Sequence, residues 1–371
     1  MTMQLKIGII GCRGIPNNYG GFEQFAQYLS EGLINKGHYV TVYNSHNHPW
    51  KQPVWKKVKI IHCYDAANLL GTAGQFIYDL NCIWDARKRN FDIILFLGYT
   101  SSSIWWRLFP KRTIIISNMD GLEWKRTKYL KPVRMFLQHA EKLAVNHSDH
   151  LIADSTEIQS YLQKMYGKEI TYISYGADIN HEENRIGLAS LNITRQGYYI
   201  IIARPEPENN ITMILEGFHQ STSIRKMIIL GNTKKGFGKY LAHKFIKDER
   251  ICFAGEIFDK MKLHLLRTNC CMYFHGHSVG GTNPSLLEAM ADRALIASHN
   301  NEFNRAVLGN NAFYFSSQEE VKELIESPIN QEEKSKMVEY NYARIIKYHS
   351  WQGIIDEYDA FFKACFNNSN K

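Results

Sequence analysis

Short, β-rich apolar runs alternate with amphipathic helical segments along most of this chain. Residues 5–10 form the first such run, and apolar residues at helical spacing then continue to Lys36-Gly37, a typical helix stop. Later strand-like runs of the first half lie at 39–43, 58–62, 93–96, 113–117, 150–153 and 170–173, with helical patterns near 74–89 and 131–147. Strands that alternate with helices predict a doubly wound, parallel α/β sheet.

The same alternation restarts after a polar stretch at residues 176–196. Strand-like runs lie at 198–203, 226–230, 251–254, 270–274 and 294–298, with helical patterns at 211–219 and 258–267. From residue 331 onward the pattern is helical and ends in an aromatic-faced segment. The second half is therefore predicted to form a second Rossmann-like sheet.

A chain of 371 residues is long for one hydrophobic core, so two domains are expected. The polar stretch places their boundary near residue 180. We therefore predict an N-terminal domain at 1–180, a C-terminal domain at 181–349 and a terminal helix and tail at 350–371. Open α/β sheets bind ligands at the carboxyl ends of their strands, so two such domains predict a ligand cleft between these edges.

Composition excludes several classes of protein. Hydrophobic residues make up 44% of the chain and aromatic residues 13%, enough to fill two cores. No apolar run approaches ~18 residues, and the first residues lack the layout of a signal peptide. The seven cysteines are odd in number and show no CxxC or His/Cys ligand spacing. We expect a cytoplasmic chain with no bound metal and no cofactor.

The most informative motif is HGHSVGGTNPSLLEAM at residues 275–290, which has the order strand, glycine-rich loop, helix. Asn283 is a favourable N-cap, and Pro284 suits the first helical position. The N–H groups of Ser285 and Leu286 would then be free, with the positive end of the helix dipole behind them. This arrangement predicts an anion site.

The same motif carries side chains suited to a sugar nucleotide. Residues 280–282 (GGT) let a ligand approach the backbone closely. Glu288 lies in the second helical turn, where a carboxylate can accept hydrogen bonds from a sugar or ribose diol. His275 or His277 could bind the donor sugar, although histidines so close together more often satisfy loop backbone groups. An ordinary capped helix after a glycine turn is the alternative reading of the motif.

A second glycine-rich loop, GCRGIPNNYGGFE at residues 11–23, lies between the first strand and the first helix. Its spacing matches neither the GxGxxG nor the GxxxxGK[ST] phosphate-binding pattern. Gly20 and Gly21 at the helix start would present N–H groups to an anion, with Glu23 in the first turn. A flexible loop with a helix cap is the alternative. Two such helix starts, one in each half, predict a diphosphate site.

Two further candidates follow strands. Arg204, after the first strand of the second half, could stabilise charge that develops on a departing phosphate, with a surface salt bridge as the alternative. Asp120 or Glu123, in SNMDGLEWKR at 117–126, could orient or deprotonate an acceptor hydroxyl. For Asp120 the alternative is an Asx-turn before Gly121.

The net charge of +8 is concentrated in one region. Residues 105–134 hold eight Lys and Arg against two acidic residues, together with Trp105, Trp106, Leu108, Phe109 and Trp124. Exposed aromatic side chains beside basic ones would suit an anionic membrane or a phosphorylated acceptor. The alternative is a solvated charged face with its tryptophans in the core. No nucleic-acid motif is present, so no nucleic-acid partner is expected.

In this order, GCRGIPNNYGGFE, DGLEWKR and HGHSVGGTNPSLLEAM resemble the motifs of family 4 glycosyltransferases of GT-B fold. More narrowly, they resemble the bacterial rhamnosyltransferases of capsule and cell-wall polysaccharide synthesis. ARPEPENNI and YHSWQGIIDEY agree with that pattern, so the resemblance covers nearly the whole chain. It implies two Rossmann-like domains facing each other across a cleft, an N-terminal one for the acceptor and a C-terminal one for the nucleotide sugar. It also implies a C-terminal helix that crosses back to the first domain.

The resemblance implies roles for single residues. Glu288 would hold the nucleotide ribose and Arg204 a phosphate, and together with Asp120 they are the expected catalytic residues. Gly20 and Gly21 would meet the diphosphate. The loop before the helix would hold donor sugar and phosphate through Gly281, Thr282, Asn283 and Ser285.

Two positions depart from the family pattern. Gly280 stands where these enzymes often have a glutamate for donor-sugar hydroxyls. Asn209 or Asn210 stands where they have a lysine, and Lys234 or Lys235 could supply the missing charge.

The resemblance implies a metal-independent, retaining transfer of a sugar from a nucleotide diphosphate. We expect a deoxyhexosyl group, rhamnosyl from dTDP-rhamnose, to pass to a polyprenyl-diphosphate-linked saccharide. The enzyme would lie in the cytoplasm, at the inner face of the plasma membrane. The alternatives are a transferase with another nucleotide sugar, a nucleotide-sugar epimerase or a sugar phosphorylase of the same fold, and a non-catalytic nucleotide-sugar sensor.

Overall fold

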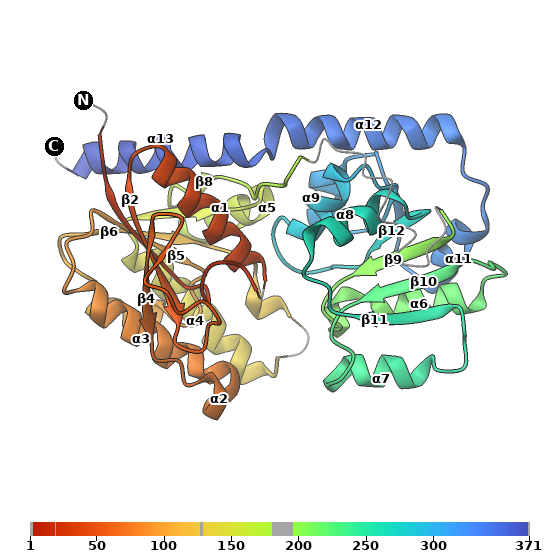
Figure 1. Cartoon of the computed structure of the whole chain (residues 1–371), viewed down its shortest axis with the longest axis horizontal. Coiled ribbons are helices and arrows are strands. Elements are labelled where there is room, and N and C mark those ends of the chain that lie inside the picture. Colours follow the sequence, from red (N-terminus) through yellow and green to blue (C-terminus); the bar gives the residue numbers. More distant parts are fainter. Residues whose placement is uncertain (1–2, 19, 127–128, 180–195, 370–371) are drawn as a thin grey trace. The chain divides into compact units, whose positions relative to one another are not determined.

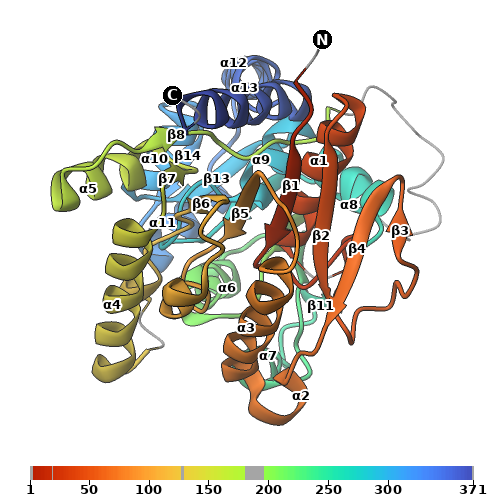
Figure 2. The ribbon, with the colours of Figure 1, turned by 90° about the vertical axis from the view of Figure 1, so that its left-hand side faces the viewer.

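A computed structural model of the chain describes residues 3–18, 20–126, 129–179 and 196–369 (Figures 1 and 2). Contacts between Cα atoms divide the chain into two compact units. The N-terminal unit comprises Met1–Trp124, Tyr129–Gly176 and Trp351–Lys371, and the C-terminal unit comprises Lys125–Lys128 and Ala177–Ser350. The predicted domain boundary at residue 180 lies outside the described residues.

The N-terminal unit is built on an eight-stranded sheet with the order β3-β4-β2-β1-β5-β6-β7-β8. Its strands are β1 (Lys6–Ile10), β2 (Tyr39–Ser45), β3 (Val54–Trp55), β4 (Val58–Cys63), β5 (Ile93–Leu97), β6 (Ile114–Asn118), β7 (His150–Ala153) and β8 (Thr171–Tyr172). Only the β3–β4 pair is antiparallel among the described strands. The strand order runs outward in opposite directions from β1 and β5, so the carboxyl ends of these two strands form the topological switch point.

The strands of this unit were predictable from the sequence because parallel strands are covered on both faces. All five residues of β5 are buried. Such a strand has no polar face, so it appears in the sequence as a continuous apolar run. The helices of this unit are α1 (Gly21–Asn35), α2 (Ala67–Leu70), α3 (Gly74–Ala86), α4 (Lys131–His147), α5 (Thr156–Tyr166) and α13 (Trp351–Ser369), and α2 has no buried residue.

The C-terminal helix α13 packs on α1 of the N-terminal unit, as predicted. The rings of Tyr28 and Trp351 stack with centroids 4.4 Å apart. A Cβ atom on Gly32 would lie 2.4 Å from the Cδ1 of Ile355, so the two helices approach this closely only with glycine at residue 32. The helical pattern from residue 331 comprises α12 (Gln331–Tyr348) and, separated from it by His349 and Ser350, the predicted terminal helix, which is α13.

The C-terminal unit is built on a six-stranded parallel sheet with the order β11-β10-β9-β12-β13-β14. Its strands are β9 (Tyr198–Ile202), β10 (Lys226–Leu230), β11 (Ile251–Gly255), β12 (Met272–His275), β13 (Ile296–His299) and β14 (Phe313–Phe315). The switch point of this sheet lies between β9 and β12, because the order runs outward from these strands on either side. Two parallel, doubly wound sheets confirm the predicted fold class.

Seven α-helices surround this sheet in the described part of the chain: α6 (Ile211–Gln220), α7 (Gly236–Lys244), α8 (Lys260–Thr268), α9 (Pro284–Ala291), α10 (Glu302–Leu308), α11 (Gln318–Glu326) and α12 (Gln331–Tyr348). The sequence pattern missed α7, α10 and α11. Each has at most nine residues, too few for a helical period to stand out. Across residues 3–18, 20–126, 129–179 and 196–369, no helix is both long and apolar enough to span a bilayer.

Candidate functional site

Most of the predicted donor-site residues lie in two loops at one edge of the C-terminal sheet or in the strand and helix, β12 and α9, that flank one of them. Residues 203–210 follow β9, and residues 276–283 follow β12. The two strands are parallel neighbours, with Tyr199 opposite Met272. Their following loops therefore emerge at the same edge, at the topological switch point. This brings Arg204 to the same edge as the HGHSVGGTNPSLLEAM motif.

Hydrogen bonds tie the two loops together. Ser278 donates through its backbone N and its Oγ to the carbonyl oxygen of Glu208, at 3.1 and 2.8 Å. The Nδ2 of Asn210 donates to the carbonyl oxygen of Gly276 at 2.8 Å. A Cβ atom on Gly276 would lie 2.1 Å from the carbonyl oxygen of Asn209, so this approach requires glycine. Asn210, at one of the two positions considered for the family's lysine, is therefore a structural link between the loops.

Arg204 is exposed, and its guanidinium forms no ion pair within the described residues. The surface salt bridge considered for it is therefore not found in this part of the chain. Its carbonyl oxygen accepts a hydrogen bond from the Nδ2 of Asn209 at 2.7 Å, which fixes the start of the loop. A permanent cation held at the carboxyl end of β9 is suited to a phosphate.

His275 and His277 stack on each other, with ring centroids 4.5 Å apart and an interplanar angle of 19°. The expectation that their rings satisfy loop backbone groups is wrong. His275 is 1% exposed and neither of its ring nitrogens has a hydrogen-bond partner, and the Nδ1 of His277 is also buried without one. The loop is held instead through the carbonyl of His277, which accepts from the side chains of Asn301 and Asn304. Buried nitrogens of this kind normally have partners, so they point to a bound water or ligand.

Burial keeps both imidazoles neutral. The pKa of His275 is lowered well below its ordinary value by burial and by the nearby His277. Burial, with the charges of Arg204 and Arg126, lowers the pKa of His277 to about 3. A neutral imidazole has one N–H donor and one acceptor nitrogen. The stacked pair can therefore donate to and accept from hydroxyl groups at neutral pH.

Asn283 caps α9 as predicted, with Pro284 in the first helical position. However, its Oδ1 accepts a hydrogen bond from the N–H of Ser285 at 2.9 Å, and its carbonyl oxygen accepts from the N–H of Leu286 at 3.0 Å. The prediction that these two N–H groups are free is therefore wrong. The physical reason is that the N-cap residue satisfies both groups, the N–H of Ser285 through its side chain and the N–H of Leu286 through its backbone carbonyl.

The neighbouring loop residues are also constrained. The Oγ of Ser285 lies 2.6 Å from the hydroxyl of Tyr273, and Thr282 is buried. Gly281 is half-buried. Gly280 has a φ of +127° with open space around the Cβ position. Because this backbone conformation favours glycine, the family's glutamate does not fit the loop here.

Glu288 is held by an arginine that the sequence analysis missed. Its Oε2 accepts a hydrogen bond from the Nη2 of Arg267 on α8, and 23% of the Glu288 side chain remains exposed. Arg267 is buried, and its Nη1 also donates to the Oδ2 of Asp292 at 3.1 Å. The signal in the sequence was a single arginine within the largely apolar end of a helix, because a buried arginine needs carboxylate partners.

In the N-terminal unit, α1 begins at Gly21, with Gly20 as an N-cap that has no side chain to occupy the helix start. The N–H groups of Gly21 and Phe22 donate to no acceptor within the described residues. Glu23 is 4% exposed, and its Oε1 accepts from the N–H of Arg13 at 2.7 Å. The glutamate therefore orders the glycine-rich loop from inside, while the helix start stays open.

Asp120 follows β6 at the carboxyl edge of the N-terminal sheet and is half-buried, with Gly121 at a φ of +59°. Burial, together with nearby carboxylates that include Asp120, raises the pKa of Tyr99 and of Tyr175. Asp120 therefore lies near two buried phenols at the edge where an acceptor is expected.

The aromatic side chains of the basic region are not exposed, which corrects the arrangement considered for a membrane surface. Trp105, Leu108 and Phe109 pack against the N-terminal core. Trp106 stacks on His147 with centroids 3.6 Å apart, and the Nε1 of Trp124 donates to Glu141. The physical reason is that the large rings gain more by packing than by hydration.

Exposed apolar side chains lie instead on α2 and around the start of α4. Both helices belong to the N-terminal unit and are labelled in Figure 2. The basic side chains Lys131 and Arg134 belong to the same turns of α4. Lys128 of the basic region lies outside the described residues. We call the following set, which lies at the start of α4, the apolar–basic surface: Leu130, Lys131, Val133, Arg134, Met135 and Phe136.

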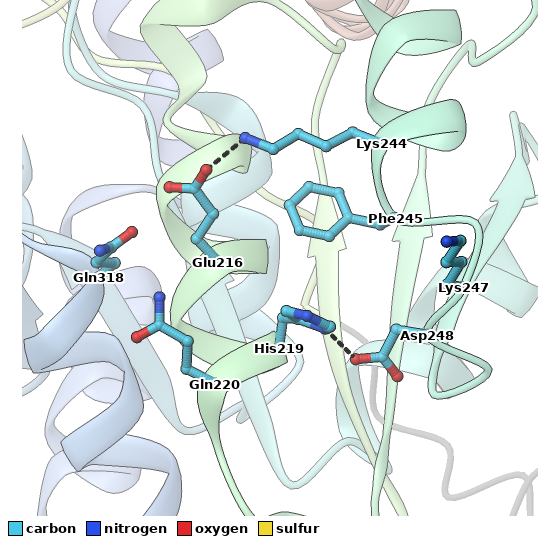
Figure 3. Close-up of a pocket in the computed structure, with 8 residues that line it drawn as sticks. All are labelled: Glu216, His219, Gln220, Lys244, Phe245, Lys247, Asp248 and Gln318. Atoms are coloured by element: carbon cyan, nitrogen blue, oxygen red, sulfur yellow. Dashed lines mark hydrogen bonds and ion pairs between the residues drawn. The ribbon is translucent and has the colours of Figure 1, made fainter.

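A separate pocket of about 640 Å³ lies in the C-terminal unit (Figure 3). It is formed around the C-terminal ends of α6 and α7, and therefore away from the loops that follow β9 and β12. His219 and Asp248 pair across it at 2.7 Å. Its lining is Glu216, His219, Gln220, Lys244, Phe245, Lys247, Asp248 and Gln318. Within the described ranges, no three His, Cys, Asp or Glu side chains are grouped to hold a metal ion.

Comparisons with known proteins identify the fold. A family model described as a domain of unknown function (DUF1972) matches residues 4–178. No curated protein matches the sequence. The structure of sucrose-phosphate synthase from Thermosynechococcus elongatus is similar with a TM-score of 0.82 and 14% identity, over 98% of this chain and 100% of that one.

Two further structures are similar over nearly the whole chain. Anabaena HepE, in complex with UDP and glucose, has a TM-score of 0.76 and 14% identity, over 97% of this chain and 100% of that one. Trehalose 6-phosphate synthase from Burkholderia multivorans has a TM-score of 0.74 and 10% identity, over 99% of this chain and 98% of that one. The chain therefore has the GT-B fold of these structures.

Proposed function

We propose that this chain is a retaining glycosyltransferase whose C-terminal unit binds a nucleotide diphosphate sugar. The observation that carries the proposal is the convergence of Arg204, the stacked pair His275 and His277, and Glu288 at the switch point between β9 and β12. HepE, which shares the fold, was solved in complex with UDP-glucose. A nucleotide sugar is therefore the partner that this fold supports best.

Each group at this edge has a role in the proposal. Glu288 accepts hydrogen bonds from the nucleotide ribose, and Arg204 binds a donor phosphate. The neutral imidazoles of His275 and His277 bind hydroxyl groups of the donor sugar, in place of the glutamate that Gly280 lacks. Such hydroxyl groups require partners that both donate and accept.

The start of α9 binds phosphate by exchange. The Oδ1 of Asn283 now accepts from the N–H of Ser285 and occupies the position that a phosphate oxygen would take. On donor binding, the phosphate replaces the side chain of Asn283 at the N–H of Ser285, with Gly281 and Thr282 of the preceding loop and Leu286 of the first helical turn beside it. The N-terminal helix start at Gly20–Gly21, whose N–H groups are open, binds a phosphate group of the substrates without such an exchange.

The proposed reaction breaks the bond between the anomeric carbon of the sugar and the donor phosphate oxygen. A bond from the acceptor oxygen forms on the same face, and the acceptor proton passes to the leaving phosphate. Arg204 and the dipole of α9 stabilise the charge of that phosphate. Asp120 orients the acceptor hydroxyl. As the motif resemblance implies, no metal and no cofactor is assigned a role.

The specific donor and acceptor that we propose are dTDP-rhamnose and a polyprenyl-diphosphate-linked saccharide of surface polysaccharide synthesis. The support is the resemblance of three motifs to the bacterial rhamnosyltransferases. The N-terminal unit binds the acceptor in this proposal.

The apolar–basic surface supports contact with the anionic membrane that carries such an acceptor. Leu130 is 77% exposed and Met135 is 60% exposed, beside Lys131 and Arg134. Apolar side chains that enter the lipid interface beside cations that meet anionic headgroups are typical of a peripheral membrane surface. We expect the protein to sediment with vesicles that contain anionic lipid and to remain in solution with neutral ones.

A paired substitution tests this surface. Leu130→Asp with Met135→Asp should abolish sedimentation with anionic vesicles. Ile224→Asp is the matched control, because Ile224 is 94% exposed in the C-terminal unit, outside the surface. Equal sedimentation of the wild type and the double variant would overturn the membrane proposal without affecting the donor site.

The transferase proposal is tested with radiolabelled nucleotide sugars and a lipid-linked acceptor. We expect transfer of label from dTDP-rhamnose to the acceptor, with retained anomeric configuration. Turnover of the donor without an acceptor would indicate an epimerase instead. The absence of a labelled product with every nucleotide sugar would overturn the proposal.

A further inference from the structure

A buried charged cluster lies directly behind Glu288. Arg267, on α8, is 4% exposed and donates through its two terminal nitrogens to two different carboxylates, Glu288 and Asp292. Asp292 is 4% exposed, and its Oδ1 lies 2.7 Å from the Nδ1 of His264. None of these three supporting residues belongs to the motifs that indicated the donor site.

The geometry of α9 explains why a guanidinium is needed there. Glu288 and the C-cap residue Asp292 are four positions apart, so their carboxylates lie on the same side of the helix and repel each other. Arg267 neutralises both, because its planar fork directs separate N–H groups to two acceptors. A lysine can meet two carboxylates, but its three N–H groups rotate about a single nitrogen and do not fix both carboxylates in a planar arrangement.

Of the two carboxylates that Arg267 binds, that of Asp292 is buried and that of Glu288 is partly accessible. The side chain of Asp292 is 3% exposed and is held by Arg267 and His264, so it anchors one arm of the guanidinium. The side chain of Glu288 is 23% exposed. Glu288 is therefore held from the inside while part of it faces solvent at the edge of the site.

We propose that Arg267 is a positioning residue, which holds the carboxylate of Glu288 in the orientation that accepts hydrogen bonds from the donor ribose. This inference rests on the proposed function, since it assigns the ribose to Glu288. Arg267 itself touches no substrate. Asp292, with His264 behind it, keeps the guanidinium in place.

Calorimetric titration with three probes tests this role: UDP, dTDP and inorganic pyrophosphate. Arg267→Gln should weaken binding of the preferred nucleoside diphosphate at least tenfold and change pyrophosphate binding less than twofold, because pyrophosphate has no ribose. Glu288→Gln should have a similar effect. The double variant should bind no more weakly than the weaker single variant, because both changes remove the same contact.

Matched variants separate positioning from folding. Arg293→Gln is the control, because Arg293 is an exposed arginine that pairs with Glu339. If Arg267→Gln does not fold, Arg267→Lys keeps the buried charge and should still weaken nucleoside diphosphate binding more than pyrophosphate binding.

The outcomes are distinct. Unchanged nucleoside diphosphate binding in a folded Arg267 variant would overturn the inference and leave the transferase proposal standing. Equal weakening of pyrophosphate and nucleoside diphosphate would also overturn it, since it would indicate general damage to the site. Failure of the wild type to bind either nucleoside diphosphate would overturn the proposed function itself, and the inference with it.

Discussion

The first N–H groups of helices α1 and α9 differ in whether they are hydrogen-bonded. In α1, the N–H groups of Gly21 and Phe22 have no acceptor within the described residues. In α9, the N–H groups of Ser285 and Leu286 both donate to Asn283. Both helices follow a glycine-rich loop at the carboxyl edge of a parallel sheet. The difference lies in the N-cap residue, which is glycine in the first case and asparagine in the second. A glycine leaves the N–H of the second helical residue, Phe22, open, and an asparagine closes the corresponding N–H of Ser285 until a stronger acceptor replaces its side chain. The N–H of Leu286 is held separately, by the backbone carbonyl of Asn283.

The glutamates of the two helix starts differ in the same way. Glu23 points inward, where its Oε1 accepts from the N–H of Arg13, and is 4% exposed. Glu288 is held from behind by Arg267 and keeps 23% of its side chain exposed. Two similar motifs therefore give one glutamate that orders a loop and one that can meet a ligand.

The largest expected effect separates these two carboxylates. Glu288→Gln removes the charge from the hydrogen bonds to the ribose, each worth about 1.5–3 kcal/mol. We expect kcat/KM for the donor to fall roughly 10- to 100-fold, mainly through KM. Glu23→Gln keeps an acceptor for the N–H of Arg13 and should change kcat/KM less than about fivefold. Steady-state kinetics measures both, and equal losses would remove the distinction between the two helix starts.

Two buried groups, one in each unit, should make the stability respond to pH in opposite directions. The folded-state pKa of His277 is about 3, below its ordinary value of 6.5. As the pH falls below ~6.5, His277 is protonated in the unfolded chain but not in the folded one. The free energy of unfolding therefore decreases by up to about 1.4 kcal/mol per pH unit, down to a pH of ~3. Burial raises the pKa of Asp79, in the N-terminal unit, to about 7. Its contribution is therefore lost as pH rises from ~3.8 to ~7.

Thermal unfolding of the wild type and of one variant at each residue, measured from pH 4 to 7.5, tests both pH dependences. His277→Gln should flatten the loss of stability on the acid side. Asp79→Asn keeps partners for Ser101 and Gln75 and should flatten the loss between pH 4 and 7. If the stability of His277→Gln falls as steeply at acidic pH as that of the wild type, the imidazole of His277 is not held neutral in the folded protein.

The smallest expected effect is on the stability of the protein when the N-cap residues of α9 and α1 are replaced. Asn283→Ala removes the acceptor of the Ser285 N–H and should destabilise the free protein by about 1 kcal/mol. The stabilisation gained from inorganic pyrophosphate should then increase, because no side chain has to be displaced. Gly20→Ala is the matched change at α1, where the backbone is extended and no cap is lost, and where the Oε2 of Glu23, 3.3 Å from the added Cβ, has to shift slightly. If Asn283→Ala gains no more from pyrophosphate than the wild type, the exchange at α9 is wrong.

The sequence was sufficient for the fold because parallel strands buried on both faces leave an unbroken apolar pattern. The strand of residues 226–230 and the helix of residues 131–147 have the predicted bounds. The same pattern brought Arg204 and Glu288 to one sheet edge, since the order of strands and helices dictates where the loops emerge.

The contacts inside the site could not be predicted, because they depend on how neighbouring elements pack. Arg267 meets Glu288 only when α8 packs beside α9, and local periodicity carries no information about that pairing. Asn283 was correctly predicted as a cap, but the sequence does not show that the cap uses the N–H groups assigned to phosphate. The rings of Trp105 and Trp106 pack because helices distant in sequence cover them, while Leu130 is left exposed.

The central claim is that the C-terminal unit binds a nucleotide diphosphate sugar through Glu288 and the start of α9. The most direct measurement is thermal unfolding of the full chain with dTDP-rhamnose, UDP-glucose and GDP-mannose, for the wild type and for Glu288→Gln. We predict that dTDP-rhamnose at 100 times its Kd stabilises the wild type by about 2.7 kcal/mol, and that most of this gain is lost in the variant. No stabilisation by any of the three, or equal stabilisation of both proteins, would contradict the claim.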